Sequence, residues 1–149
     1  MITVRPFNHI GPGQAPSFAV AALAKRIVEA ERSGAGSIAV GNLSARRDFT
    51  DVRDVVRAYR LLVEFGTPGE VYNVCSGRDV SIEEVAQSLL GLAGSALELE
   101  TDPSLVRAVE VPVLRGDLAK LQDATGWKPE ISLEQTLADV MSFWRDRAE

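Results

Sequence analysis

Apolar residues recur at helical spacing in several stretches of the chain. Between residues 18 and 32, for example, Val20, Leu23, Ala24 and Ile27 lie three or four positions apart, which places them on one face of a helix. The same spacing predicts further helices over residues 52–65, 82–93 and 133–144. In the second of these, the apolar stripe consists of Val52, Val55, Val56, Tyr59, Leu62 and Val63.

Residues that favour helix starts precede two of these stretches. Ser81 is followed three residues later by Glu84, which is the arrangement of a capping box. Ser132 and Gln135 repeat that spacing before the last helix. A short helix is also predicted over residues 117–124, where an aspartate can cap the first turn.

Short apolar stretches between the helices predict strands. Residues 2–7 and 70–75 have the pattern of buried strands, and turn-forming residues at 8–14 predict a loop after the first of them. Residues 37–40 predict another short strand, and residues 97–100 alternate like an edge strand. Strands that alternate with helices indicate an α/β or α+β class.

Composition narrows the function classes. The 149 residues suit one compact domain, and 46% apolar with 25% charged residues is ordinary globular usage. A net charge of −5 argues against bulk binding to nucleic acid. One cysteine, Cys75, excludes an internal disulfide, and one histidine, His9, excludes a His-rich metal centre, so we assign no metal ligands.

Membrane and export signals are also lacking in the sequence. No apolar run approaches the roughly 20 residues that span a bilayer. The first residues do not have the basic and apolar regions of a signal peptide. We therefore expect a cytoplasmic protein that does not interact with membranes.

Complete catalytic machinery is missing from the 149 residues. No glycine-rich phosphate loop follows a predicted strand. No Tyr-x-x-x-Lys pair is present, because Tyr59 and Tyr72 are followed four residues later by Val63 and Ser76. We therefore assign no catalytic residue.

A few polar residues are candidates for ligand binding. Arg47 lies in a predicted loop before a helix, where its guanidinium can either bind a phosphate or remain exposed to solvent. Asn8 follows a predicted strand and is either a ligand contact or a turn former. His9 can contact a ligand or bond a nearby backbone carbonyl. Arg107 and Glu110 can form a ribose–phosphate clamp or a solvated ion pair.

Four blocks of sequence carry recognisable motifs. They are residues 5–14 (RPFNHIGPGQ), 40–54 (VGNLSARRDFTDVRD), 70–77 (EVYNVCSG), and 107–117 together with GWKP at 126–129. In this order they resemble the C-terminal half of the extended short-chain dehydrogenase/reductase family that acts on nucleotide sugars. The resemblance is greatest to GDP-6-deoxy-4-keto-mannose reductases, followed by GDP-mannose 4,6-dehydratases.

The resemblance implies a fold and a domain organisation. It implies the last strands of a Rossmann-like parallel sheet and a small mixed α/β domain that binds the nucleotide sugar. Residues 1–149 would form this single C-terminal substrate-binding region. The glycine-rich NAD(P) loop and the catalytic Ser/Thr, Tyr and Lys would lie upstream of Met1, so we expect a fragment of a longer enzyme. NAD or NADP would then bind mainly to the absent half, and we expect this chain alone to bind neither.

The resemblance also implies roles for the candidate residues. Asn8 and Arg47 would contact the diphosphate of a GDP-sugar, and His9 would lie near the nicotinamide. The backbone of Ala39 and Val40 would meet the guanine.

Two further residues and two departures from the family pattern complete the implied site. Arg107 and Glu110 would bind phosphate and ribose. Ala108 replaces a proline that is common in this clamp. Gln14 stands where dehydratases place an arginine, which favours the reductase branch.

A half-enzyme would be incomplete as a folding unit. The strands at 2–7 and 70–75 would be interior parallel strands, and without an upstream half they would expose apolar surface. We therefore expect a homodimer, aggregation, or dependence on an upstream half-protein. The alternatives for function are the corresponding half of a GDP-mannose dehydratase or nucleotide-sugar epimerase, a stand-alone nucleotide-binding module, and a non-functional remnant.

Overall fold

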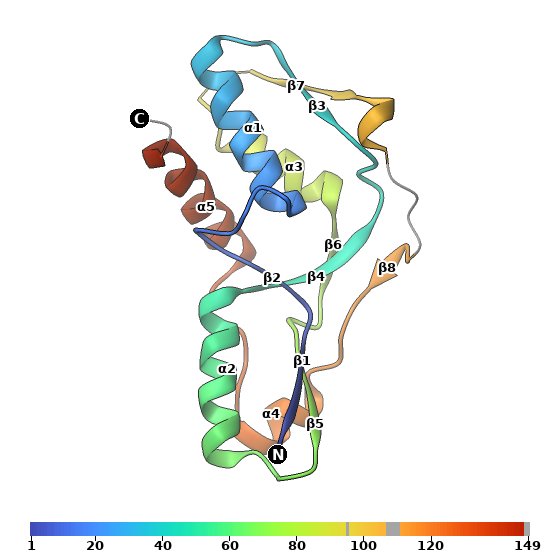
Figure 1. The fold of residues 1–149 in the computed structure, drawn as a ribbon, viewed down its shortest axis with the longest axis vertical. Coiled ribbons are helices and arrows are strands. Elements are labelled where there is room, and N and C mark those ends of the chain that lie inside the picture. Colours follow the sequence, from blue (N-terminus) through green and yellow to red (C-terminus); the bar gives the residue numbers. More distant parts are fainter. Residues whose placement is uncertain (95, 107–110, 148–149) are drawn as a thin grey trace.

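A computed structural model describes residues 1–94, 96–106 and 111–147 (Figure 1). Its helical elements are α1 (Ala19–Ser33), α2 (Val52–Phe65), α3 (Ile82–Gly91), the 3-10 turn η1 (Pro103–Leu105), α4 (Ala119–Thr125) and α5 (Leu133–Arg147). Its strands are β1 (Thr3–Pro6), β2 (Asn8–Ile10), β3 (Ser37–Val40), β4 (Arg46–Asp51), β5 (Val71–Val74), β6 (Asp79–Ser81), β7 (Glu98–Thr101) and β8 (Val113–Leu114). Within these ranges, no helix is long and apolar enough to cross a lipid bilayer.

The elements form a lower and an upper part that meet at β4 (Figure 1). In the lower part, β1 pairs in parallel with β5, and Leu62, Tyr72 and Trp127 belong to a core shared with α2 and α4. In the upper part, β3 pairs in parallel with β7, while α1, α3 and α5 surround a second core that includes Ile27 and Leu89. Between the two parts, β4 pairs with β2 and β8 in parallel and with β6 in antiparallel orientation.

Several predictions are confirmed. The class is mixed α/β, as the pattern indicates, and the strands at 2–7 and 70–75 pair in parallel, as the family resemblance implies, with Val4 opposite Tyr72. The capping box at the start of α3 is present in full. The Ser81 hydroxyl accepts a hydrogen bond from the Glu84 N–H, and the Glu84 carboxylate accepts one from the Ser81 N–H.

Two predictions around the junction are wrong. The strand predicted over residues 2–7 ends at Pro6, and the chain resumes as β2 at Asn8, where a loop was expected. Arg47 also lies in a strand, β4, and not in a loop. The reason is tertiary, because β1 hydrogen-bonds to β5 while β2 leaves that sheet and pairs with β4. Short polar strands such as β2 are stabilised by hydrogen bonds to their partner strands. They show no alternation of apolar and polar residues from which the sequence could predict them.

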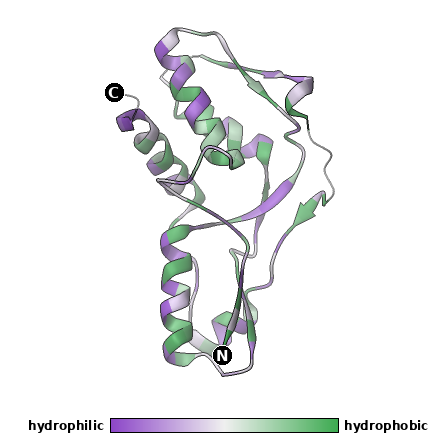
Figure 2. Cartoon of the chain, viewed as in Figure 1, coloured by the Kyte–Doolittle hydropathy of each residue, from purple (hydrophilic) through white to green (hydrophobic). Residues whose placement is uncertain are grey.

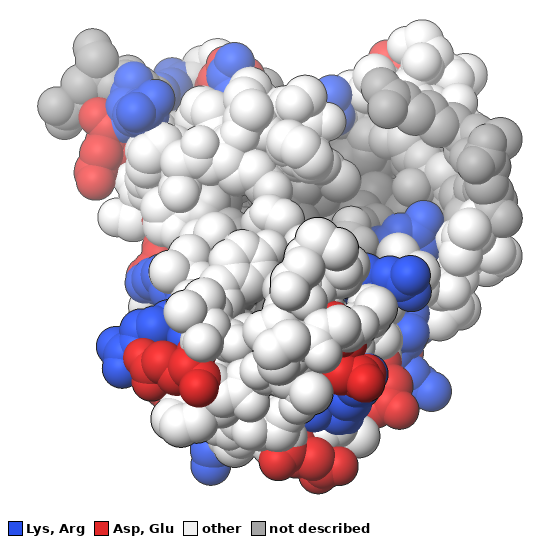
Figure 3. All heavy atoms as spheres, turned by 60° about the horizontal axis from the view of Figure 1, so that its bottom comes forward, with Lys and Arg blue, Asp and Glu red and all other residues white. Residues whose placement is uncertain are grey.

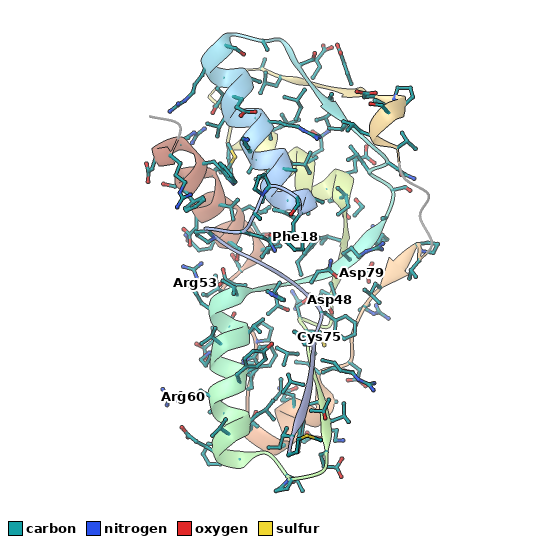
Figure 4. The ribbon with its side chains drawn as sticks, in the orientation of Figure 1. Phe18, Asp48, Arg53, Arg60, Cys75 and Asp79 are labelled. Carbon is teal, nitrogen blue, oxygen red and sulfur yellow. The ribbon has the colours of Figure 1, made fainter. Side chains whose placement is uncertain are left out.

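A buried carboxylate on β4 connects three segments at this junction (Figure 4). Asp48 is fully buried and accepts hydrogen bonds from the N–H and hydroxyl of Ser76 at 2.7 and 2.6 Å. It also accepts from the N–H groups of Gly77 at 2.9 Å and Gly116 at 3.2 Å. A Cβ at Gly116 would lie 2.5 Å from the Cys75 sulfur, so only glycine allows this close approach. Asp48 therefore joins β4 to the loop after β5 and to the segment after β8.

Two more buried acids of the 40–54 block, Asp51 and Asp54, hold α2 in place. The Asp51 carboxylate accepts hydrogen bonds from the Arg53 guanidinium and from the Thr136 hydroxyl of α5 at 2.8 Å. Burial raises the pKa of Asp51, but these hydrogen bonds outweigh it and lower the pKa below its ordinary value. The Asp54 carboxylate accepts from the N–H of Ile131 at 2.9 Å. Three aspartates of this motif, Asp48, Asp51 and Asp54, thus accept hydrogen bonds within the fold.

Only part of the apolar stripe on α2 is buried. Val55 and Leu62 face the lower core with 3% and 1% of their surface exposed. Val56, Tyr59 and Val63 are exposed by 61%, 40% and 85%. The apolar residues of α2 therefore lie on adjoining sides of one helix, as the sequence predicts, but half of them face solvent.

Replacing Asp48 by alanine removes the acceptor of all four hydrogen bonds at the junction. We expect the free energy of unfolding to fall by about 2–5 kcal/mol, because each buried donor left unpaired costs about 1–3 kcal/mol before relaxation. Urea denaturation followed by circular dichroism measures the change. Asp123→Ala, on the exposed side of α4, is the control and should change stability by less than about 0.5 kcal/mol. Equal losses in the two variants would contradict the role of Asp48.

Candidate functional site

A cavity of about 1150 Å³ lies where the upper and lower parts meet. Its wall is built from β2, the first turns of α1, the loop after β3, one face of β4, and residues beside η1 and β8. These segments are far apart in the sequence, so the cavity exists only in the folded chain. Its size is suitable for a small organic ligand.

The charge of the cavity wall is opposite to that of the whole chain. The chain has 21 acidic and 16 basic residues. Nevertheless, the charged side chains among the described lining residues are Arg26 and Arg47, and no aspartate or glutamate lines this part of the wall. Hydrogen bonds from Ser104, and after them the nearby charge of Arg26, lower the pKa of Asp102. Arg47 has no carboxylate contact among the described residues. A wall with guanidinium groups and no acidic lining residue favours an anionic ligand.

Arg47 is oriented toward the cavity by the alternation of β4. Arg47 and Phe49 line the cavity, whereas Asp48 between them is buried in the junction. The Arg47 Nη1 donates to the carbonyls of Arg46 at 2.7 Å and Val111 at 2.8 Å. Nε and Nη2 of Arg47 make no hydrogen bond to the described residues, so these donors can serve a ligand.

Neighbouring arginines in the sequence have different surroundings. The Arg46 guanidinium donates to the Asp79 carboxylate at 2.6 Å and to the Glu84 carboxylate at 3.1 Å. These contacts raise the pKa of Arg46, with the hydrogen bond to Asp79 as the largest cause. Arg46 therefore stabilises the fold, and Arg47 is the member of the pair that faces the cavity.

The N-terminus of α1 contributes backbone donors to the same wall. Phe18 is the N-cap, it is 57% exposed, and its side chain caps no N–H (Figure 4). No acidic residue stands in the first turn of this 15-residue helix, and Ala19 and Val20 line the cavity. The partial positive charge of a helix N-terminus adds to that of the arginines.

Arg26 was not identified from the sequence. It lies two turns into α1, and its Nη1 donates to the carbonyl of Ala39 at 3.0 Å, which holds the side chain against β3. Along the sequence it is one of several charged residues on the polar side of an amphipathic helix. Only the contact between α1 and β3 places it at the cavity.

Asn8 and His9 both line the cavity, as members of β2. The His9 Nδ1 lies 3.2 Å from the Phe7 carbonyl, which makes this nitrogen the donor. The Gln14 amide donates to the His9 carbonyl at 2.9 Å, and its side chain also lines the cavity. The local hydrogen bond considered for His9 is therefore present, and it is compatible with the ring being exposed at the cavity.

The remaining candidates lie beside the cavity or outside the described residues. Ala39 and Val40 do not line the cavity, whose wall after β3 begins at the next residue, Gly41. The Ala39 carbonyl accepts from Arg26, and the Val40 carbonyl accepts from the Asp102 N–H at 2.9 Å. The roles predicted for Ala39 and Val40 stay predictions. Arg107 and Glu110 lie outside the described residues.

Cys75 does not have the properties of a nucleophile. It is completely buried next to the junction. Burial, followed by the nearby charge of Asp48, raises the pKa of its thiol to about 11. A buried thiol with a raised pKa is a poor nucleophile, and Cys75 is not one of the residues that line the cavity.

Comparison with known proteins identifies the family. The model of the GDP-mannose 4,6 dehydratase family matches residues 1–140. The chain belongs to this family. The resemblance inferred from the four sequence blocks is thus confirmed.

Related proteins agree with this assignment. Over 148 residues the chain is 43% identical to the GDP-6-deoxy-D-mannose reductase of Pseudomonas aeruginosa, a match that covers 99% of this chain and 49% of that protein. The structure of RMD from Pseudomonas aeruginosa complexed with NADPH is similar with a TM-score of 0.92 at 44% identity, and the match covers 98% of this chain and 48% of that one.

A second solved structure, of a protein named as an epimerase, has a similar fold. The UDP-glucose 4-epimerase of Thermotoga maritima, solved with UDP-glucose, has a TM-score of 0.86 at 29% identity, with 99% of this chain and 47% of that one covered. The chain therefore spans about half the length of the relatives that it matches. It has the Rossmann-like mixed α/β fold of these proteins.

The environment of Cys75 predicts slow thiol chemistry. At pH 8 we expect the folded chain to react with DTNB about 100-fold more slowly than the urea-unfolded chain, because the thiolate is the reactive form and the pKa of about 11 leaves little of it. Absorbance of the released thionitrobenzoate measures both rates. Similar rates in the two states would show that Cys75 is accessible and its pKa ordinary.

Proposed function

We propose that this chain is the GDP-sugar-binding half of a GDP-6-deoxy-4-keto-mannose reductase. The observation that supports this most is the wall of the cavity, which two arginines and the uncapped N-terminus of α1 line together, with no acidic residue among the described lining residues. A nucleoside diphosphate sugar has the corresponding negative charge. The 43% identity to a GDP-6-deoxy-D-mannose reductase favours this member of the family.

The diphosphate would bind at the arginine side of the cavity. Arg47 is already held by backbone carbonyls, so its remaining donors are oriented before the ligand arrives. The Asn8 amide would add a donor and an acceptor from β2. Arg107 and Glu110 would complete the site on phosphate and ribose.

The guanine would bind near the end of β3. Ala39 and Val40 would supply backbone contacts there, alongside Arg26, whose guanidinium is anchored on the Ala39 carbonyl. Arginine presents paired donors that suit the O6 and N7 acceptors of guanine. This arrangement would favour GDP over UDP.

The residues of this chain do not fit a complete dinucleotide site. The 149 residues contain no glycine-rich phosphate loop, and His9 is our one candidate for a contact with the nicotinamide end. In a complete reductase NAD or NADP would supply the hydride for the 4-keto carbon. This chain would bind and orient the sugar nucleotide, and the rest of the enzyme would hold the cofactor and the catalytic residues.

Several parts of this proposal follow from the same reasoning. Residues 1–149 would act as a single substrate-binding region, inactive by itself, which needs an upstream half-protein or a second copy. A cytoplasmic location belongs to the proposal as well. The corresponding half of a dehydratase is the nearest alternative, but Gln14, whose amide is engaged with the His9 carbonyl, favours the reductase.

Calorimetric titration of the purified chain with GDP tests the proposal. Separate titrations with UDP and ADP serve as controls for specificity. We expect GDP to bind in preference to both. Arg47→Ala should weaken GDP binding tenfold or more, about 1.4 kcal/mol, because it removes charged hydrogen bonds to the diphosphate. Arg47→Lys should recover part of this loss, because lysine restores the positive charge but not the paired N–H donors of the planar guanidinium.

Arg60→Ala is the matched control, because Arg60 is an exposed arginine on α2 that pairs only with Glu64 among the described residues. It should bind GDP like the unchanged chain. Absence of binding to a folded sample would reject an autonomous GDP site. Preference for UDP would favour an epimerase half.

A further inference from the structure

The first residue of α1 breaks a rule that α2 and α3 follow. Asp51 and Ser81 cap those two helices with side chains that accept a hydrogen bond from a free N–H. Phe18, the N-cap of α1, has the same extended backbone, with φ −94° and ψ 142°, but its side chain caps nothing and is 57% exposed. Polar residues are strongly preferred at this position. A local rule that is broken without a structural gain is typical of a functional position.

The Phe18 side chain belongs to an apolar part of the cavity wall. Pro16, Ala19 and Val20 line the cavity beside it. Figure 2 shows the first turns of α1 as hydrophobic, whereas β4 is mainly hydrophilic. Figure 4 shows Phe18 at the lower end of α1. An exposed aromatic ring in a cavity wall offers an apolar surface to a ligand.

Gln14 contributes a polar group to the wall four residues before Phe18. Its Nε2 donates to the His9 carbonyl at 2.9 Å, which fixes the amide. Its Oε1 makes no hydrogen bond to the described residues, so this oxygen can accept one from a ligand hydroxyl. The Gln14 N–H donates to the Gly11 carbonyl, and the Phe18 N–H donates to the Ala15 carbonyl. These two turns keep the segment between Gln14 and Phe18 compact.

The cavity wall has a cationic end and an uncharged end. Arg26 lies about 12 Å from Phe18 along the axis of α1, at about 1.5 Å per residue. The described lining residues from Pro6 to Val20 include no Asp, Glu, Lys or Arg. Charged side chains of both signs gather elsewhere, for example on the lower end of the molecule (Figure 3). An uncharged ligand group with several hydroxyls fits the end of the wall that carries Gln14 and Phe18.

The proposed function places the sugar at this uncharged end, and the present inference rests on it. The diphosphate would bind at Arg47, and His9 would lie near the nicotinamide. Hydride transfer requires the 4-keto carbon of the hexose to lie beside the nicotinamide. Gln14 is bonded to the His9 carbonyl, so its amide lies at the end of the cavity that the hexose would occupy.

We propose that Phe18 and Gln14 determine the specificity of this site for a 6-deoxyhexose. The Phe18 ring packs against the C6 methyl group, and the Gln14 Oε1 accepts a hydrogen bond from a ring hydroxyl. Mannose carries a hydroxyl on C6 where the deoxy sugar has only hydrogen. A hydroxyl packed against an aromatic ring loses a hydrogen bond to water, so the site prefers the deoxy sugar.

Calorimetric titrations of the chain with GDP, GDP-mannose and GDP-6-deoxy-mannose test this proposal. The two GDP-sugars share their nucleotide, so the ratio of their dissociation constants reports on the hexose alone. We expect GDP-6-deoxy-mannose to bind about fivefold more tightly than GDP-mannose, because one methyl group is removed from water against the ring. Both GDP-sugars should bind more tightly than GDP.

Phe18→Ser separates the binding role of this residue from a role in folding. Serine supplies the missing N-cap, so the melting temperature should rise by about 2–4 °C. The preference for the deoxy sugar should nevertheless fall below about twofold, because the apolar contact is lost. Any effect of the new cap on the diphosphate cancels in the ratio. A residue with only a structural role would not combine a more stable fold with lost discrimination.

Three further variants serve as rescue and control. Phe18→Leu keeps an apolar side chain and should retain a preference of about threefold. Gln14→Ala should weaken both GDP-sugars by about threefold relative to GDP and leave their ratio unchanged, since it removes a hydrogen bond that both sugars make. Phe65→Ser is the matched control, because Phe65 is also 57% exposed but does not line the cavity. It should keep the full preference.

Failure of this inference can be told apart from failure of the proposed function. The inference is overturned if the unchanged chain binds the two GDP-sugars equally, or if Phe18→Ser keeps the full preference, and GDP binding would still support the proposed function in both cases. A preference for the deoxy sugar together with tighter binding of UDP than of GDP would retain the hexose contact and reject the proposed nucleotide. A folded sample that binds none of these nucleotides would reject both.

Discussion

The arrangement of the whole molecule depends on the buried carboxylate of Asp48. A buried charge without a described cationic partner is stable only where several donors converge on it, and here Ser76, Gly77 and Gly116 supply them. These donors belong to segments that follow β5 and β8, while the acceptor belongs to β4. The lower and upper parts therefore cannot shift relative to each other without breaking these bonds.

The same strand connects this junction to the candidate site. Because side chains alternate along β4, Asp48 points into the junction and Arg47 into the cavity. The Val111 carbonyl that orients Arg47 lies close in sequence to Gly116, which donates to Asp48. Asp48, which holds the junction together, and Arg47, the candidate ligand contact, are thus neighbours in one short motif, and the hydrogen bonds of the first help to fix the position of the second.

The lower part of the chain is closed on one side and open on the other. The segment around Ile131 covers one flank of α2, and α4 and β5 continue that side. On the other side, Val63 and the edge of β1 face solvent. This asymmetry agrees with the length comparison, in which relatives with the same fold are about twice as long.

The sequence alone determined the features that depend on local periodicity, namely the helices and the capping box of Ser81 and Glu84. The parallel pairing of β1 with β5 was expected only from the resemblance to the family. Only the tertiary structure decided that the first strand is interrupted at Phe7 and that Arg47 lies in the strand β4. It also decided that Arg26 lies at the cavity and that Val63 is exposed. The physical reason is the range of the interactions involved. Helix formation and capping act between residues three or four positions apart, whereas short polar strands, cavity walls and buried surface depend on partners that are distant in the sequence.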